Sequence, residues 1–176
     1  MDLDNKKILV VYFSHKGQNY SNGRIIDLKK GNTAVVADMI AEVTGADIFE
    51  IQAIKEYPYE YNACTVKAKD ELRANSRPEL ANNAEISCYD VIFLGYPNWW
   101  GTMPMPVWTF LDGHDFTGKI IFPFCTHEGS GMGNSENDLR NLVSDADIMM
   151  GFAVHGSSVD KARKNVENWI MKGCEV

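Results

Sequence analysis

The sequence has no pair of cysteines at the spacing of a disulfide framework or a metal site. The four cysteines are far apart and form no CxxC or Cys/His pattern: Cys64, Cys88, Cys125 and Cys174. Disulfide-rich scaffolds and zinc sites both depend on such patterns, so neither is expected, and no metal ligand is predicted. Scattered cysteines suit a reducing compartment, and we expect a cytoplasmic protein.

An excess of positive charge is also absent. The chain has 17 basic and 24 acidic residues, which gives a formal net charge of −7. A protein that binds the phosphate backbone of nucleic acid needs the opposite balance, so no nucleic-acid partner is expected. An acidic surface instead favours solubility or docking to a basic partner.

No apolar run is long enough to cross a membrane. The first run, ILVVYF at residues 8–13, is far shorter than the roughly 20 residues that a membrane-spanning helix needs. It follows MDLDNKK, whose acidic residues do not suit a signal peptide. We therefore expect no membrane association.

Several enzyme signatures are missing. No serine stands in a GxSxG nucleophile elbow, and the phosphate-binding motif GxxxxGK[ST] does not occur. The segment GSGMG at 129–133 lacks the GxGxxG spacing of a dinucleotide fingerprint and does not follow the first apolar run. Serine hydrolases and nucleotide triphosphatases are therefore disfavoured, and GSGMG is only a weak signal of a dinucleotide-binding fingerprint.

What the sequence does contain is an alternation of strand-like and helix-like segments. Apolar runs at 8–13, 91–96, 119–125 and 146–154 predict buried strands, and the alternating segment 46–54 predicts an edge strand. Helical stripes fall at Val35, Val36, Met39, Ile40 and Val43; at Tyr61, Cys64, Ala68 and Leu72; at Val107, Phe110 and Leu111; at Leu139, Leu142 and Val143; and at Val159, Ala162, Val166, Trp169 and Ile170.

This alternation predicts an α/β fold. We expect a three-layer doubly wound sandwich with a five-stranded parallel sheet in the order 2-1-3-4-5, forming a single domain over residues 1–176. In such a sheet, ligands bind beyond the carboxyl ends of the strands where the strand order reverses. The loops after Phe13, Tyr96 and Cys125 are therefore the candidate site. The first and third strand ends read FSHK and GYPN, without the acidic residues of a phosphorylated receiver domain.

The first loop has the features of a phosphate cradle. Ser14 leaves the first strand, and Gly31, Asn32 and Thr33 open the first helix, whose start offers unpaired N–H groups and the positive end of a dipole. The alternative is that Asn32 or Thr33 only caps its own helix. Residues 19–30 separate the two halves of this cradle, and the Asn-Gly pair inside them predicts a hairpin flap. The flap could cover a ligand, form a subunit contact or be a surface insertion.

The other two loops suit a planar ring. Trp99 and Trp100 stand at the end of the third strand, where one indole can stack on a ring while the other supports the loop, although packing on the sheet is the simpler alternative. After the fourth strand, glycines expose backbone amides, and His127 either donates to a ring carbonyl or is held structurally. A flat ring with a single phosphate satisfies all three loops, and flavin mononucleotide (FMN) is such a ligand.

Over nearly its full length the chain also resembles the flavodoxin family. The resemblance rests on ILVVYFS, GNTAVVA, DVIFLGYPNWWGTMPMPVWTFL and IIFPFCTHEGSGMGNS. It implies bound FMN, with phosphate contacts from the first loop and ring contacts from the other two. The candidate cofactor-binding residues are Ser14, Lys16, Asn32, Thr33, Ala34, Pro97, Asn98, Trp99, Trp100, Gly101, Thr126, His127, Glu128, Gly129, Ser130 and Gly131. The flap departs from the short SxxGNT pattern of the family.

Three functions stay open. The first is electron transfer through bound FMN, with a redox partner protein or a small electron acceptor. The second is an NAD(P)H-dependent quinone or nitro reductase, in which a homodimer interface completes the pocket and Tyr57, Tyr59, Tyr61 and the flap shape it. The third is a binding module without redox activity. No catalytic residue is predicted, and whether the chain is an enzyme stays open.

Overall fold

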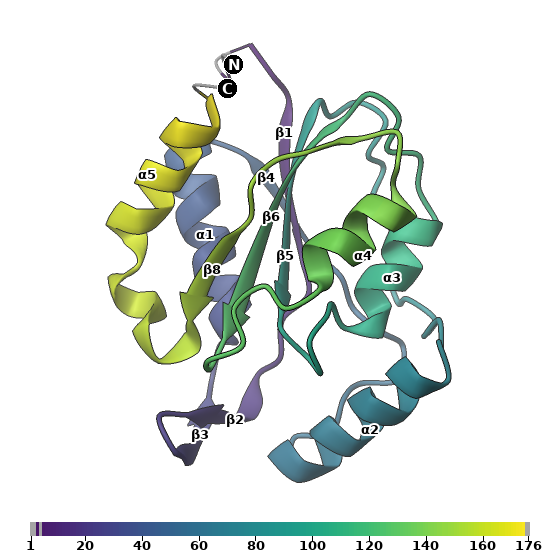
Figure 1. The fold of residues 1–176 in the computed structure, drawn as a ribbon, viewed down its shortest axis with the longest axis vertical. Helices are drawn as coiled ribbons and strands as arrows, with labels where there is room; N and C mark the ends of the chain where they lie inside the picture. The colour runs from purple at the N-terminus through teal and green to yellow at the C-terminus, as the bar shows by residue number, and fades with distance from the viewer. Residues whose placement is uncertain (1–2, 4, 175–176) are drawn as a thin grey trace.

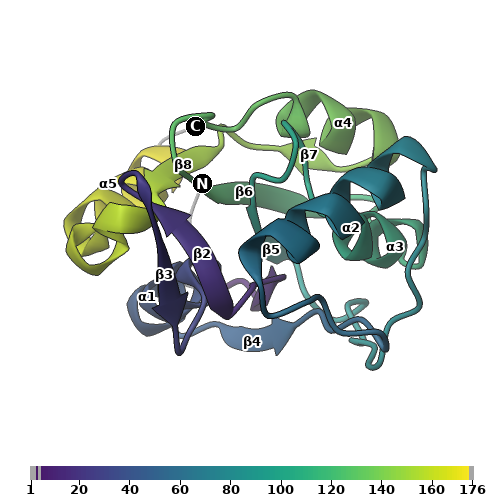
Figure 2. The same cartoon turned by 90° about the horizontal axis from the view of Figure 1, so that it is seen from below.

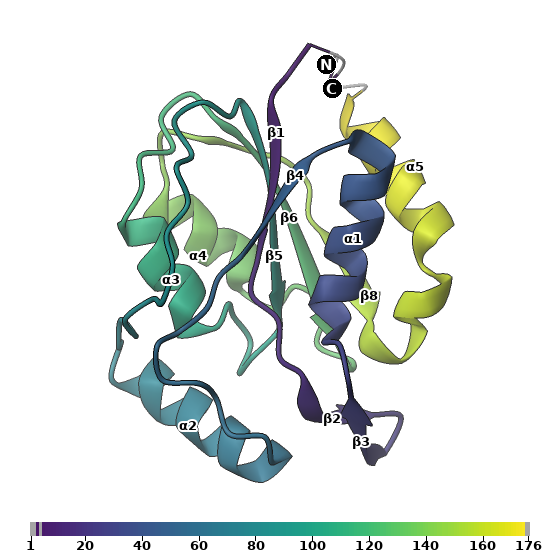
Figure 3. The same cartoon turned by 180° about the vertical axis from the view of Figure 1, so that it is seen from behind.

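The structure, a computed structural model, describes residue 3 and residues 5–174. Figures 1 and 3 show a central sheet with α1 and α5 on one face and α3 and α4 on the other. In chain order the elements are β1 (Ile8–Tyr12), β2 (Gly17–Ser21), β3 (Arg24–Leu28), α1 (Asn32–Thr44), β4 (Asp47–Glu50), α2 (Tyr61–Arg73), β5 (Val91–Pro97), α3 (Met105–Asp112), β6 (Ile120–His127), α4 (Ser135–Leu142), β7 (Asp147–Ile148), β8 (Phe152–His155), the 3₁₀ helix η1 (Gly156–Lys161) and α5 (Arg163–Cys174).

The predicted sandwich and strand order are confirmed. The sheet runs β4-β1-β5-β6-β7, every pairing within it is parallel, and β8 also pairs with β6. β4 is an edge strand that pairs with β1, as its alternating sequence predicts. None of the helices in the described part of the chain is long and apolar enough to cross a lipid bilayer.

The core lies on both faces of β1, β5 and β6. In β1, Ile8, Val10 and Tyr12 belong to the core beneath α1 and α5, whereas Leu9 and Val11 belong to the core beneath α3 and α4. All five side chains are buried. A strand buried on both faces has no polar side chains to alternate with, which explains the unbroken apolar run.

The predicted fifth strand, 146–154, is present as two short strands. β7 pairs with Ile120 and Ile121, β8 pairs with β6 from Phe124 onward, and the interruption lies opposite Pro123. Proline has no N–H to donate to a ladder, so regular pairing stops there. Across the gap, Gly151 N donates to Glu136 Oε1 (3.0 Å), a side chain of α4.

Helix α1 ends where expected but is rotated relative to the predicted stripe. Its C-cap, Gly45, is left-handed with a φ of 70°. Val43, predicted to face the core, is 37% exposed, whereas Ala34 and Ala37 are buried. The small alanines let the helix approach β1 and β5 closely, and a stripe drawn through the bulkiest residues misses them.

Residues 17–28 form a separate antiparallel hairpin of β2 and β3. Ser21 faces Arg24 in the register, so Asn22 and Gly23 make a two-residue turn, both with positive φ (47° and 82°). This is the conformation that the Asn-Gly pair favours. Seen from below, the hairpin and α2 lie at the carboxyl end of the sheet, on either side of the ends of the strands (Figure 2).

We predict that Gly95→Ala destabilises the protein because β5 and β6 are packed too tightly for a methyl group. A Cβ at Gly95 would lie 2.1 Å from Phe124 Cζ, and Phe124 is fully buried and cannot swing away. The free energy of unfolding, measured by urea denaturation, should fall by about 1–3 kcal/mol.

Gly113→Ala is the matched control. A Cβ there would meet its nearest atom, Thr109 O, at an ordinary 3.4 Å, and the residue is in the right-handed region. Its stability should stay at or slightly above the wild-type value. Equal losses in the two variants would contradict the tight packing of β5 on β6.

Candidate functional site

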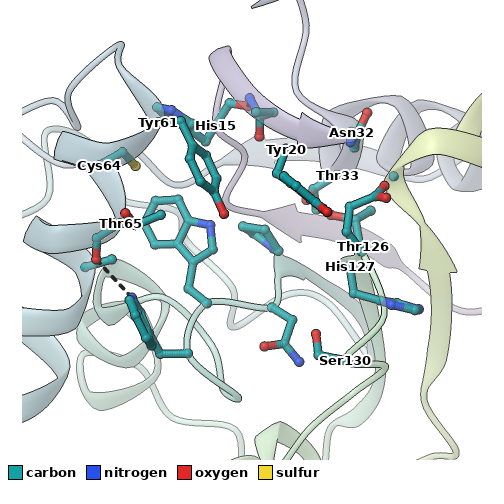
Figure 4. Close-up of a pocket in the computed structure, with 18 of the residues that line it drawn as sticks. His15, Tyr20, Asn32, Thr33, Tyr61, Cys64, Thr65, Thr126, His127 and Ser130 are labelled. Atoms are coloured by element: carbon teal, nitrogen blue, oxygen red, sulfur yellow. Dashed lines mark hydrogen bonds between the residues drawn. The ribbon is translucent and has the colours of Figure 1, made fainter. Parts of the chain in front are cut away.

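A cavity of about 410 Å³ lies at the carboxyl ends of the strands, between the hairpin and α2 (Figure 4). This volume is within the roughly 300–1,000 Å³ that is typical of small-molecule sites. Residues from six segments line it: His15, Gln18, Asn19, Tyr20, Asn32, Thr33, Tyr61, Cys64, Thr65, Ala68, Pro97, Asn98, Trp99, Trp100, Thr126, His127, Glu128, Ser130 and Gly156.

One end of the cavity is the start of α1. The N-cap is Gly31, and the helix has no side-chain cap. Neither Asn32 nor Thr33 therefore caps its own helix, which was the alternative explanation of this motif. Thr33 Oγ1 instead shares a buried hydrogen bond of 2.8 Å with Thr126 Oγ1.

The first turn of α1 keeps two donors for a ligand. Ala34 N donates to Ser14 Oγ at 3.2 Å, so this amide is satisfied by the loop after β1. Within the described residues, the N–H groups of Asn32 and Thr33 have no hydrogen-bond partner. Unpaired amides at a helix start, together with the helix dipole, favour a bound anion.

His15 also lines the cavity, and the sequence analysis missed it. Its Nε2 atom is buried and has no partner among the residues that the structure describes. Its ring meets Trp99 edge to face, with the centroids 5.9 Å apart. Burial lowers the pKa of His15. The only sequence signal was its place in the loop after the first strand.

The tryptophan loop is a tight reverse turn. Trp99 and Thr102 exchange backbone hydrogen bonds of 3.0 and 3.2 Å, so Trp100 and Gly101 form the turn, both with positive φ (56° and 88°). A left-handed conformation is costly for a bulky residue such as Trp100, on the order of 1–3 kcal/mol. Trp100 Nε1 donates to Thr65 O at 2.9 Å, which fastens this strained position to α2 (Figure 4).

Trp99 is held by a cluster of aromatic rings. It packs edge to face on Phe13 and Tyr57, with centroid distances of 5.4 and 4.9 Å. Trp100 is 51% exposed by comparison. Both indoles line the cavity, and Trp99 is the one whose position the core fixes.

Asn98 joins the second loop to the third. Its Nδ2 donates to Gly131 O at 2.8 Å, and its Oδ1 accepts from Gly101 N at 2.9 Å. Its backbone N donates to Thr126 O. The loops after β5 and β6 therefore behave as one unit on the floor of the cavity.

His127 has a defined tautomer. Its Nδ1 accepts from Gly129 N at 2.9 Å, so the proton of the neutral ring is on Nε2. Burial, and then the nearby His155, lower the pKa of His127. At neutral pH the residue is therefore a neutral donor through Nε2–H.

Cys64 contributes no reactive group to the cavity. Burial raises the pKa of its thiol to about 12, so it stays protonated near neutral pH. Among the described residues, no group of three or more His, Cys, Asp or Glu side chains could hold a metal ion.

The structure brings ten of the sixteen candidate residues to the cavity wall: Asn32, Thr33, Pro97, Asn98, Trp99, Trp100, Thr126, His127, Glu128 and Ser130. Ser14, Lys16 and Ala34 line a neighbouring cavity of about 540 Å³ on the other side of the first loop. Gly101, Gly129 and Gly131 shape the loops, each with a positive φ, and do not line the 410 Å³ cavity.

Two walls of the cavity were not identified as cofactor contacts from the sequence. The hairpin contributes Gln18, Asn19 and Tyr20, and α2 contributes Tyr61 and Cys64 with their neighbours. Figure 4 shows the rings of Tyr20 and Tyr61 pointing into the cavity, 6.3 Å apart between centroids. Of these residues, Tyr61 and the two that belong to the predicted flap, Asn19 and Tyr20, were expected to shape a pocket.

Comparisons with known proteins give one family. The model of the family described as Flavodoxin matches residues 7–172. A Bacteroides uniformis ATCC 8492 protein provisionally assigned as a flavoprotein is 29% identical over 94% of this chain and 98% of its own, with a TM-score of 0.74. A similarly assigned protein from Bacteroides eggerthii DSM 20697 is 29% identical over 92% of this chain and 98% of its own, with a TM-score of 0.71.

A third solved structure shares the fold at lower identity. It is a flavoprotein from Lactobacillus acidophilus NCFM in complex with FMN, 22% identical over 89% of this chain and 97% of its own, with a TM-score of 0.64. No curated protein gives a significant match.

We predict that His15 makes folding less favourable at mildly acidic pH. Its folded-state pKa lies below the usual value, so as the pH falls through about 6.5 the unfolded chain takes up a proton first. The stability that neutral His15 contributes is complete above that pH and is lost as the pH falls toward the folded-state pKa. The free energy of unfolding should therefore decrease between about pH 7.5 and about pH 5.5, and His15→Asn should reduce that decrease.

Lys16→Asn is the control because it changes the next residue of the same loop and leaves His15 in place. It should keep the wild-type pH dependence. An identical slope in His15→Asn and the wild type would show that His15 is not protonation-sensitive in the folded protein.

Proposed function

The chain belongs to the flavodoxin family, and on that premise we propose that it is a redox protein that binds FMN at the carboxyl ends of β1, β5 and β6 and transfers electrons through it. The observation that carries the proposal is a single cavity with unpaired helix-start amides at one end and a fixed indole beyond them. A planar ring with one phosphate has the matching chemistry.

The donors at one end of the cavity suit the phosphate of FMN. The N–H groups of Asn32 and Thr33 have no other partner among the described residues, and the positive end of the α1 dipole lies with them. No Lys or Arg is among the residues that line the cavity. The phosphate would therefore be held by neutral donors, and Lys16, which lines the adjacent cavity, would act only from a distance.

The other end of the cavity suits the flavin ring in shape and polarity. Trp99 offers an aromatic wall that Phe13 and Tyr57 hold in place. Asn98 on the tryptophan loop and Ser130 on the loop after β6 place polar groups at this end of the cavity. The FMN complex of the Lactobacillus acidophilus flavoprotein, which has the same fold, supports this assignment.

FMN, when bound, supplies reversible one-electron and two-electron chemistry. The residues of this chain set how favourable its reduction is. The lining has no cationic side chain and includes the carboxylate of Glu128. Such a wall disfavours added negative charge, so we expect it to lower the reduction potential relative to free FMN.

A second candidate function has its own observation. Tyr20 of the hairpin and Tyr61 of α2 make an aromatic wall that also suits a small planar substrate. This favours the NAD(P)H-dependent quinone or nitro reductase as the alternative. Its electron acceptor is a small molecule, whereas the first candidate uses a redox partner protein or a small acceptor.

We predict that Asn32→Asp weakens FMN binding through repulsion of the phosphate. The repulsion between the new carboxylate and a phosphate bound at the start of α1 should cost about 1–2 kcal/mol of binding free energy, which corresponds to a roughly tenfold higher Kd. Riboflavin, which lacks the phosphate, should bind the variant and the wild type equally. The Kd values are measured by the quenching of flavin fluorescence.

Asn137→Asp adds the same charge on an exposed position of α4 outside the cavity and should change neither Kd. Equal weakening of FMN and riboflavin by Asn32→Asp would mean that the phosphate does not lie at the start of α1. Absence of FMN binding by the wild type would end the proposal.

We predict that the FMN-loaded protein keeps its visible absorbance when NADPH is added without oxygen and bleaches when a flavodoxin reductase is also present. The carrier function requires that result, because the protein then receives electrons from a partner. Rapid bleaching by NADPH alone, with catalytic turnover of a quinone, would instead select the reductase.

A further inference from the structure

Glu128 connects three segments that are far apart in the sequence. Its Oε1 accepts from Ser157 N at 2.7 Å, at the start of η1, and its Oε2 accepts from Asn22 N at 3.2 Å, in the turn of the hairpin. The side chain is half-buried and lines the cavity. Both carboxylate oxygens thus bind backbone amides, and such charge-assisted bonds are the stronger kind.

The other end of the hairpin is fastened to the segment before α2. Gln18 N donates to Tyr59 O at 2.9 Å, and Gln18 Oε1 accepts from Tyr61 N at 3.3 Å. Tyr59 Oη donates to Asp27 Oδ1 at 2.5 Å. Since Gln18, Asn19 and Tyr20 line the cavity, the hairpin is one of its walls, with one end at the segment before α2 and its turn at the loop after β6.

Glu128 provides the main attachment of the free end of the hairpin. Within the described residues, the Asn22–Glu128 bond is the one hydrogen bond between the hairpin turn and the loop after β6. Four of the five residues of β3 are exposed. An isolated two-stranded hairpin that buries little apolar surface is marginally stable, so one charge-assisted bond decides how often its end lifts.

We propose that Glu128 is a latch that keeps the hairpin closed over the cavity, and that its release gates the uptake and loss of the cofactor. The identity of that cofactor as FMN rests on the proposed function. Glu128 is a positioning residue in this proposal, because it acts on the cavity through Asn22 and the hairpin.

The test is Glu128→Gln, which removes the charge and one of the two accepting oxygens while keeping the size of the side chain. A gate limits passage in both directions, so both the association and the dissociation rate constants of FMN should rise, each by about tenfold, with a smaller change in Kd. Stopped-flow flavin fluorescence measures both rates. A residue that merely contacts bound FMN would change dissociation alone.

Glu136→Gln is the matched control. Glu136 also accepts a backbone N–H, from Gly151, but it lies on α4 outside the cavity lining, and among the described residues it has no hydrogen bond or ion pair to the hairpin. Its variant should keep the wild-type rates. Unchanged rates in Glu128→Gln, or a rise in dissociation alone, would overturn the gate.

Hydrogen exchange in the protein without FMN tests the latch independently of the cofactor. The amide of Asn22 should exchange about tenfold faster in Glu128→Gln than in the wild type, while amides within α1 keep their protection. Equal exchange rates of the Asn22 amide in the variant and the wild type would contradict the proposal that Glu128 holds the hairpin closed. If the wild type bound no FMN, the proposed function would fail, and this exchange measurement would still decide whether Glu128 holds the hairpin.

Discussion

The contact between the first loop and the start of α1 is the constraint on which the site depends. A Cβ at Gly31 would lie 2.2 Å from Ser14 Oγ and 2.6 Å from His15 O, so only glycine allows this approach. Through it, Ser14 Oγ reaches Ala34 N and satisfies one amide of the first turn. The amides of Asn32 and Thr33, two residues that line the cavity, have no partner among the described residues, and this end is therefore suited to an anion.

The sequence was sufficient to predict the layers and the place of the site because both follow from strands buried on two faces. The unbroken apolar runs of β1, β5 and β6 identify the centre of the sheet, and parallel strands bring the next loops to one edge. Asn98 and Thr126, which the sequence places in these loops, line the cavity for this reason. The break between β7 and β8 was harder to predict, because it depends on the pairing of that strand opposite Pro123.

The rest of the wall could not be predicted because a cavity and a core use the same residues. Cys64 and Ala68 have the helical spacing of a core-facing stripe, and they are buried, yet they face the cavity as well. His15 is a lone histidine in a loop, with no spacing to identify it. The hairpin was predicted from Asn22 and Gly23, but a turn motif does not state what the flanking strands cover.

The cavity combines a fixed floor with one weakly held wall, and the two have different physical origins. The floor is formed by Trp99, which the aromatic core holds, and by Asn98, whose hydrogen bonds join two loops. The weakly held wall is the hairpin, whose β3 is largely exposed and whose turn is bonded to Glu128. The proposed electron transfer needs a ring held in a fixed position, which the floor can provide. Exchange of the bound molecule needs a wall that opens at low cost, and the hairpin, which forms a sheet of its own, can open without disturbing the packing of the central sheet.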